Sequence, residues 1–330
     1  MRHSSFVTHH SSFRIHHFPF QLDAPTRGRR ILVALADQPS TIPADRLRIH
    51  AARRFTRRLA TSHYENFTVV SAALPRHLWQ HFYNIYAFCR HADDLADEIS
   101  ETAESLRALA EFRADLLRIY DGQPPRHPIH IALADTIRQF DIPAEPFLRL
   151  IDAFEQDQRI NRYQTYAQVL DYCTRSADPV GRLVLYLIGY CDETRQRLSD
   201  CTCTALQLTN FWQDVARDYR DRNRIYIPAE DLAAFGVTEA DIAQGRFTPA
   251  YAELMRFEVD RAQKLFDQGR KLLPMIDPRY RIDIELFTLG GEMILQRIRQ
   301  IGYDTITTRP VLRRRDKMGL FARMLLAHLW

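Results

Sequence analysis

The decisive stretch of the sequence runs LWQHFYNIYAFCRHADDLADE over residues 78–98. Its apolar residues recur at steps of 4, 3, 4 and 3, which is the spacing of one face of an amphipathic helix: Leu78, Phe82, Ile85, Cys89 and Ala92. Pro75 comes shortly before them, as is typical of an early helix position. The stretch therefore predicts a long helix with one buried face.

A polar stripe lies next to this apolar face. It consists of Tyr86, Arg90, Asp93 and Asp97 at steps of 4, 3 and 4, so two carboxylates share one face, one turn apart. Because like charges repel, the helix gains nothing from this pair unless a cation lies nearby. Mg²⁺ suits such oxygen ligands, since it usually takes one or two carboxylates together with substrate phosphates. A solvated acidic helix face is the alternative interpretation of this motif on its own.

A second copy of the stripe favours the metal interpretation. Residues 207–218 read QLTNFWQDVARD, with polar residues at steps of 3, 4 and 4: Gln207, Asn210, Asp214 and Asp218. The adjacent Phe211 and Trp212 indicate a packed helix, whose carboxylates then face an interior or a cavity. Four buried carboxylates without cations would be very costly. Two such helices facing each other predict a site for metal ions and a diphosphate.

The remaining pattern predicts an all-α fold. Helices are expected at about 102–120, 129–140, 144–160, 165–190, 194–219, 249–273 and 279–301, and no strand-like alternation competes with them. Glycine is scarce, with 11 residues in 330, and the sequence contains neither GxGxxG nor GxxxxGK[ST], which argues against a nucleotide-binding α/β fold. We expect one large helical domain over 59–310, after a basic, His-rich and flexible extension over 1–58. A basic amphipathic segment follows over 311–330.

Charge is distributed unevenly along the chain. Residues 1–58 carry a net charge of +8 and residues 309–330 carry +5, which leaves −9 for the body of the chain. Basic ends suit an anionic surface such as phospholipid headgroups, and solvated tails are the alternative. In the last segment, arginines and Lys317 precede Phe321, Met324 and Leu325, which would share one helix face. The sequence therefore predicts peripheral attachment to the inner membrane through this segment, and no nucleic acid as a partner.

The cysteines and the longest apolar runs indicate the cellular compartment of the protein and whether it contains a membrane-spanning helix. Five cysteines without a CxxC pair argue against a disulfide scaffold and against a zinc site, so we expect a reducing, cytoplasmic location. No apolar run approaches the roughly 18 residues of a membrane-spanning helix. The early histidines match no metal-ligand template, and no apolar stretch of a secretory signal peptide follows the first charges.

With these motifs in view, the chain resembles the squalene/phytoene synthase family across roughly residues 59–318. The two aspartate motifs match the paired aspartate-rich motifs of that family, and RIYIP over 224–228 resembles the stretch that follows its second motif. Finer segments resemble the bacterial hopanoid-pathway branch called HpnC, which acts as hydroxysqualene synthase: HYENF over 63–67, CTRSADPVG over 173–181, IYIPAEDL over 225–232, GYD over 302–304 and Arg309-Pro310. The resemblance implies an isoprenoid-synthase-type helical domain with a central cavity.

The resemblance also implies roles for individual residues. Asp93, Asp97, Asp214 and Asp218 would hold Mg²⁺, or Mn²⁺ as an alternative, and Asn210 would add or orient an oxygen ligand. Arg90 would bind the diphosphate. Tyr86 is expected among the catalytic residues, and the other residues expected to bind the substrate are His63, Gln207, Tyr303 and Arg309.

One position departs from part of the family. Eukaryotic-type squalene synthases have a tyrosine at the position of Arg175, where it is tied to the cyclopropyl intermediate. This departure favours a branch that takes presqualene diphosphate to hydroxysqualene without NADPH, with Arg175 among the catalytic residues. Head-to-head condensation of farnesyl diphosphate or other prenyl diphosphates is the alternative reaction. A non-catalytic assembly or lipid-binding protein is the alternative of another class, and other hopanoid-pathway enzymes are candidate partners.

Overall fold

The computed structural model describes residues 44–62 and 74–312, and these residues form an all-α fold, as predicted. Within this part of the chain the only β-type pairing is an isolated bridge between Arg162 and Ile225. The α-helices are α1 (Ala44–Ser62), α3 (Trp79–Asp97), α4 (Thr102–Tyr120), α5 (Pro128–Phe140), α6 (Glu145–Asp157), α7 (Tyr166–Ser176), α8 (Asp178–Leu187), α9 (Glu193–Gln213), α10 (Val215–Arg222), α11 (Ala229–Ala234), α12 (Glu239–Ala243), α13 (Pro249–Gly269) and α14 (Pro278–Gln300). Two 3₁₀ segments, η1 (Arg76–Leu78) and η2 (Arg270–Met275), complete them.

Helix ends largely follow local sequence signals. Thr165, Thr248 and Asp277 cap α7, α13 and α14 by accepting hydrogen bonds from backbone N–H groups of the first turn. Prolines occupy the first turns of α5, α13 and α14, where a missing N–H costs nothing. These signals explain why the predicted starts of the helices at 129, 165, 249 and 279 lie within one residue of the starts of α5, α7, α13 and α14.

Two long predicted helices are wrong because the structure breaks each of them. The helix expected over 165–190 ends at Ser176, and Ala177 adopts φ −123° before α8 begins with Asp178 and Pro179. In a continuous helix Pro179 could not donate a hydrogen bond to the carbonyl of Arg175, four residues earlier, and its ring would clash with that carbonyl, so the break follows from the proline. The helix expected over 194–219 breaks at Asp214, which has φ −113° and joins α9 to α10. The helical body also begins earlier than residue 59, because α1 starts at Ala44.

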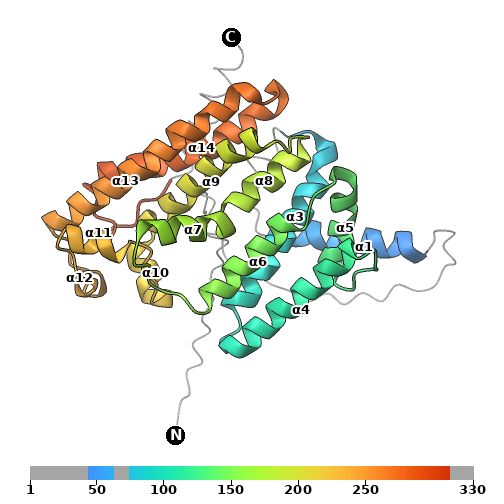
Figure 1. Cartoon of the computed structure of the whole chain (residues 1–330), viewed down its shortest axis with the longest axis horizontal. Coiled ribbons are helices and arrows are strands. Elements are labelled where there is room, and N and C mark those ends of the chain that lie inside the picture. Colours follow the sequence, from blue (N-terminus) through green and yellow to red (C-terminus); the bar gives the residue numbers. More distant parts are fainter. Residues whose placement is uncertain (1–43, 63–73, 313–330) are drawn as a thin grey trace, which may run out of the picture.

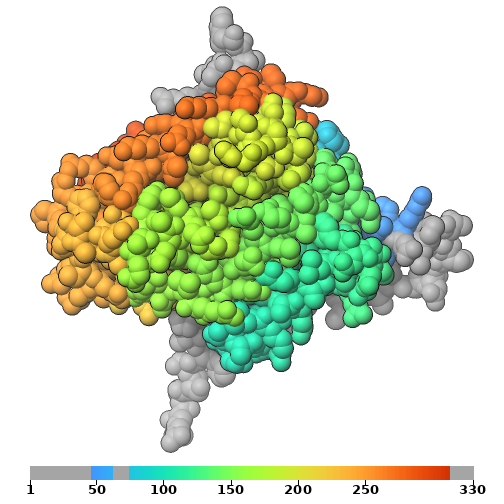
Figure 2. Space-filling view, viewed as in Figure 1, coloured from blue at the N-terminus to red at the C-terminus, as the bar shows by residue number. Residues whose placement is uncertain are grey.

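Helix α9 lies in the middle of the molecule and carries the first part of the second motif. It packs against α7, α8, α13 and α14, and α13 and α14 run along one side of the molecule while α4 and α5 lie on the opposite side (Figure 1). One core cluster joins α9 to α13 and α14 around Trp212, Met255 and Phe266. A second joins α3 to α4, α6 and α8 around Phe88, Phe112 and Phe147. In the space-filling view α6, α7 and α8 fill the face between α4 and the C-terminal helices (Figure 2).

Close helix approaches around α9 depend on glycine. A Cβ at Gly181 of α8 would come within 2.3 Å of Ser199 Oγ, and a Cβ at Gly291 of α14 within 2.4 Å of the Phe266 ring. Both contacts are shorter than real Cβ atoms allow, so a larger side chain would push α8 or α14 out of position. The two glycines therefore fix how near these helices come to α9 and α13.

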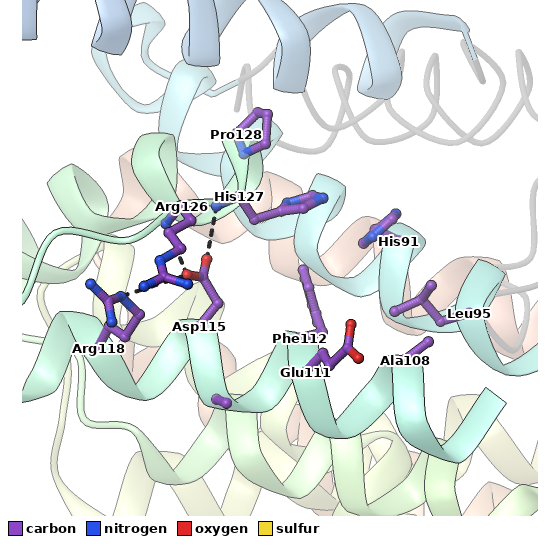
Figure 3. Close-up of a pocket in the computed structure, with 11 residues that line it drawn as sticks. His91, Leu95, Ala108, Glu111, Phe112, Asp115, Arg118, Arg126, His127 and Pro128 are labelled. Carbon is purple, nitrogen blue, oxygen red and sulfur yellow. Dashed lines mark hydrogen bonds and ion pairs between the residues drawn. The ribbon is translucent and has the colours of Figure 1, made fainter. Parts of the chain in front are cut away.

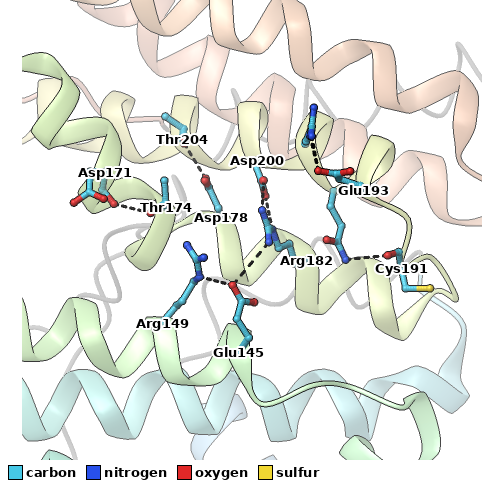
Figure 4. A network of polar contacts seen from close by, with 12 residues as sticks. Glu145, Arg149, Asp171, Thr174, Asp178, Arg182, Cys191, Glu193, Asp200 and Thr204 are labelled. Atoms are coloured by element: carbon cyan, nitrogen blue, oxygen red, sulfur yellow. Dashed lines mark hydrogen bonds and ion pairs between the residues drawn. The ribbon is translucent and has the colours of Figure 1, made fainter.

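A polar network also holds α6, α8 and α9 together (Figure 4). Arg182 of α8 donates two hydrogen bonds to Asp200 of α9, at 3.0 and 2.6 Å, and lies 4.0 Å from Glu145 of α6. Thr204 of α9 donates to the buried Asp178 at 2.8 Å. Because charge-assisted contacts are directional, this network sets the rotation of α9 and thereby the direction of its motif residues.

None of the helices in the described residues combines the length and apolar character needed to cross a membrane.

Candidate active site

The first aspartate motif lies in the last turns of α3, with its side chains turned inward. Arg90 is buried and donates from Nε to Asp94 at 3.1 Å, while its Nη2 lies 2.6 Å from the other Asp94 oxygen and 3.8 Å from Glu98. The sequence interpretation had assigned Arg90 to the diphosphate and had not paired it with Asp94. Burial raises the pKa of Asp94 to about 7, although Arg90 opposes this shift. Asp94 is therefore part of the motif's charge balance.

Among the carboxylates of this motif, Asp93 is the one whose ionised form burial disfavours most. Its side chain is 3% exposed, and its Oδ2 has no hydrogen-bond partner. Burial raises the pKa of Asp93 well above its usual range, and the carboxylate of Asp97 one turn away raises it further, while Arg222 and Arg90 act in the opposite direction. An ionised Asp93 thus needs additional positive charge beside it.

The second motif spans the junction of α9 and α10. Gln207, Asn210, Asp214 and Asp218 are all buried, as the packed-helix interpretation predicted. Although the helix breaks at Asp214, the N–H of Asp218 still donates to the carbonyl of Asp214 at 2.8 Å. The break therefore keeps the two aspartates one turn apart, at the end of α9 and the start of α10.

Arginines from elsewhere in the chain neutralise both motifs. Arg222 of α10 donates to Asp97 of α3, across 125 residues of sequence. Arg309, from the segment after α14, donates to both oxygens of Asp214, at 2.5 and 3.2 Å. The first contact places the end of the second motif directly against the first motif. The structure therefore links the helix that carries Asp218 to the first motif through Arg222, and the shared metal site expected from the repeated motifs stays a prediction.

Behind the second motif lies a buried ion pair within an aromatic cluster. Arg224 donates to the Asp157 carbonyl at 2.7 Å and lies 3.4 Å from its carboxylate, which also accepts a hydrogen bond from Tyr172 at 3.0 Å. Tyr226 stacks on Phe211 with ring centroids 3.6 Å apart. The chain after α10 is thereby fixed to α6 and α9, which holds Asp218 and Arg222 in position.

The remaining predicted residues lie in different surroundings. Tyr86 is buried against α1, where it packs in a small cluster with Ala60 and Tyr83, and its burial raises its pKa. Gln207 is buried with an Nε2 that has no hydrogen-bond partner. Tyr303 follows α14 in a left-handed conformation (φ 66°) and packs against the core cluster of α9 and α13. His63 lies outside the described residues, as does the C-terminal segment from 313 onward.

Arg175 contacts neither aspartate motif through its hydrogen bonds. It lies in the last turn of α7, where it donates to Gln156 at 2.9 Å and pairs with Asp171. These residues line a groove of about 510 Å³ that also contains Arg159 and Arg162. Its catalytic role therefore stays a prediction, which depends on the resemblance.

A larger cavity lies on another side of α3. It measures about 760 Å³ and is lined by His91, Phe112 and His127, with Asp115 accepting hydrogen bonds from the backbone N–H groups of Arg126 and His127 (Figure 3). The His91 and His127 rings stack with centroids 4.6 Å apart, and burial lowers the pKa of His91 to about 4. None of the motif aspartates lines this cavity.

The donor set of the two motifs fits Mg²⁺. In the described residues no three imidazole, thiolate or carboxylate groups converge closely enough to enclose an ion by themselves. Mg²⁺ does not require such a cage, because it commonly takes one or two carboxylates, water and substrate phosphates. Asp93 and Asp97 each keep a buried Oδ2 without a hydrogen-bond partner, one turn apart on the same helix. These are the oxygens that a hard cation would use.

Sequence reasoning missed Asp94, Asp157 and Arg222 as parts of the site. Arg222 lies in the run RDYRDRNR over 217–224, which reads as a solvated helix face with alternating charges. Its partner Asp97 is remote in sequence, so no local spacing reveals the pair. Asp157 belongs to no recognisable sequence motif, and its contact with Arg224 in the structure is what identifies it as a neighbour of the site.

Comparisons with known proteins identify the family of the chain. The family model described as squalene/phytoene synthase matches residues 60–316. A phytoene synthase of Thermus thermophilus is 32% identical over 270 residues, which cover 82% of this chain and 91% of that protein. A phytoene synthase of Arthrospira platensis is 29% identical over 266 residues, covering 77% of this chain and 85% of that protein.

Solved structures show the same fold. The crystal structure of squalene synthase HpnC from Alicyclobacillus acidocaldarius matches with a TM-score of 0.74 and 47% identity, and the match covers 78% of this chain and 96% of that chain. A dehydrosqualene synthase in complex with a ligand matches with a TM-score of 0.77 at 23% identity, over 86% of this chain and 98% of that chain. The isoprenoid-synthase type of fold expected from the sequence is confirmed by these matches.

Proposed function

Because the chain belongs to the squalene/phytoene synthase family, we propose that it ionises presqualene diphosphate in a Mg²⁺-dependent step and that water captures the rearranged carbocation to give hydroxysqualene. The observation that carries the proposal is the contact of Arg222 with Asp97, because it links α10, which bears Asp218, to the first aspartate motif and supports a site shared by both motifs. The 47% identity to an HpnC squalene synthase supports this branch over others.

The reaction breaks a C–O bond, and the electron pair leaves with the diphosphate. Bound Mg²⁺ would supply positive charge where this negative charge develops. Asp93 and Asp97 of α3, with Asp214 and Asp218 of the second motif, would hold the ions, and Asn210 would add an amide oxygen. Arg90, Arg222 and Arg309 bring guanidinium groups to the same carboxylates, and such groups suit bidentate contacts with a diphosphate.

The second half of the reaction needs a single nucleophile. After the cyclopropane ring opens, the positive charge becomes allylic, and one water molecule adds to it and loses a proton. The product oxygen therefore comes from water, and no hydride donor is required. Arg175, which replaces the tyrosine of eukaryotic-type enzymes, belongs to this proposal as the residue that distinguishes the branch.

Condensation of prenyl diphosphates is the second candidate function, since several relatives of the chain are phytoene synthases. A non-catalytic role has less support, because a protein that binds no diphosphate has no use for buried, paired aspartates. The proposed location is cytoplasmic, with contact to the inner membrane surface and to other hopanoid-pathway enzymes.

A substrate assay tests the proposal. Purified protein with Mg²⁺ is given presqualene diphosphate or farnesyl diphosphate without NADPH, and the products are identified by mass spectrometry. We expect presqualene diphosphate to be consumed and an alcohol to form. Formation of phytoene-like or squalene-like hydrocarbons from farnesyl diphosphate alone would contradict the assignment.

Variants connect the activity to the motifs. Asp93→Asn and Asp214→Asn should each lose activity by orders of magnitude while remaining folded, since a neutral amide removes like-charge repulsion. Asp121→Asn is the matched control, because Asp121 is exposed after α4. Turnover by the motif variants equal to that of the control would contradict the roles of these aspartates.

A further inference from the structure

Helix α1 lies largely outside the part of the chain that the family model matches. It runs from Ala44 to Ser62, whereas the match begins at residue 60. Its sequence ADRLRIHAARRFTRRLATS contains six arginines and a single acidic residue. The helix lies at the edge of the molecule, against α3 and α5 (Figure 1). Most of its surface therefore lies outside the region that the family model describes.

Buried contacts fix which face of α1 points outward. Ala52, Thr56 and Ala60, spaced by four residues, are at most 3% exposed. Thr56 donates to Asn84 of α3 at 2.7 Å, and Asn84 donates to the Ala132 carbonyl of α5 at 3.0 Å. Because these polar contacts are buried, rotation of α1 about its axis would leave hydrogen-bonding groups without partners. The opposite face of the helix is thus held toward solvent.

The outward face combines positive charge with exposed apolar side chains. Leu47 and Phe55 are 43% and 46% exposed, and both lie on the one helix that carries six arginines. Arg54, Arg57 and Arg58 lie around them at helical spacing and are exposed. In the described part of the chain these three arginines form no ion pair, whereas Arg53, on the inner edge, pairs with Asp135 at 2.5 Å.

We propose that this face of α1 binds the surface of an anionic phospholipid bilayer. The unpaired guanidinium groups match phosphate-bearing headgroups, and Leu47 and Phe55 can enter the boundary between headgroups and acyl chains, as apolar residues of interfacial helices do. Nucleic acid backbones also attract arginine, but they offer nothing apolar for Leu47 and Phe55. The proposal concerns binding alone, so it does not depend on the reaction proposed above.

Vesicle flotation with the full chain tests it. The wild-type protein should float with vesicles of phosphatidylglycerol and phosphatidylcholine at low ionic strength, and it should detach at high salt as screening increases. It should not float with phosphatidylcholine alone. The variant Arg54→Gln/Arg57→Gln/Arg58→Gln should partition at least about tenfold more weakly. A matched control, Arg107→Gln/Arg197→Gln/Arg256→Gln, removes the same charge from exposed ion pairs on α4, α9 and α13 and should float like the wild type.

Two further measurements keep the result interpretable. The variant Leu47→Ser/Phe55→Ser keeps every charge, and the variant protein should also float less than the wild type. Circular dichroism shows whether each variant keeps its helices. Equal flotation of the α1 variant and the wild type would overturn the proposal, as would an equal loss in both triple-arginine variants. RNA that displaces the protein from vesicles at low concentration would favour a nucleic acid partner and would also overturn it.

Discussion

At the level of single residues, the charge balance of the two motifs depends on arginines that other segments supply. Arg222 contacts Asp97, Arg309 contacts Asp214, and Arg90 contacts Asp94 of its own helix. Each of these arginines offsets one carboxylate, while Asp93 keeps a buried oxygen without a hydrogen-bond partner. The spacing of the aspartates repeats in both motifs, so the sequence predicts the pairs, although the second pair lies across the break between α9 and α10. The positions of the arginines depend on tertiary contacts, so Arg222 could not be found in that way.

Removal of the Arg222 guanidinium should destabilise the protein in the absence of metal. In Arg222→Met, Asp97 loses its counter-charge next to the buried Asp93, which costs roughly 1–3 kcal/mol. We expect a melting temperature several degrees below that of the wild type in chelator, and a smaller difference when Mg²⁺ is present. Arg222→Lys should lie between the two proteins. Identical melting curves of the wild type and Arg222→Met in chelator would show that this contact contributes nothing.

Asp283 of α14 should make stability depend on pH. It is buried, neither carboxylate oxygen has a hydrogen-bond partner, and burial raises its pKa from 3.8 to about 7. Above about pH 4 the unfolded chain releases a proton that the folded chain retains, so this residue lowers stability as the pH rises toward 7. Asp283→Asn should therefore melt higher than the wild type, by a few degrees at pH 8 and by less at pH 5. A difference that is the same at both pH values would contradict the shifted pKa, and Asp121→Asn serves as the exposed control.

At the level of helices, apolar periodicity was a good guide wherever a helix buries large apolar side chains. It predicted α4 at 102–120 and the start of α13, because Leu109, Phe112 and Leu116, or Leu254 and Met255, mark a buried face. It missed α1, whose buried face consists of Ala52, Thr56 and Ala60. Small and polar residues leave no apolar stripe among six arginines, so the sequence predicts a flexible extension where the structure has α1. Contact with α3 and α5 stabilises this helix, and single-helix patterns do not report such contacts.

Helix spacing around α9 should be sensitive to a single methyl group. Gly291→Ala places a Cβ against the Phe266 ring of α13 and Leu206 of α9, and such overpacking typically costs about 1–3 kcal/mol. We expect a melting temperature lower by a few degrees. The double variant Gly291→Ala/Phe266→Leu should lose less than the sum of the two single variants, since the smaller side chain leaves room for the methyl group. Strict additivity would mean that the two positions do not contact each other as the structure shows.

At the scale of the whole molecule, the fold and the chemistry meet where α3, α9 and α10 converge. The all-α class could be predicted, because it depends on repeated local spacing, and a single site formed by both motifs stays a prediction. The break at Ala177 has a local signal in Pro179 that the predicted helix over 165–190 overlooked. The break at Asp214, the ion pair of Asp157 with Arg224 and the outward face of α1 depend on how helices pack, which local sequence patterns do not reveal. The same packing separates the 760 Å³ cavity at His91 from the motif aspartates, although His91 is only two residues from Asp93.

The central claim is that paired aspartates promote loss of diphosphate and that water captures the cation. It is tested most directly by turnover of presqualene diphosphate with Mg²⁺ in ¹⁸O-labelled water, with the product analysed by mass spectrometry. We predict an alcohol that carries one ¹⁸O atom, formed without NADPH and abolished by chelator. An unlabelled product, or turnover that persists in excess chelator, would contradict the claim.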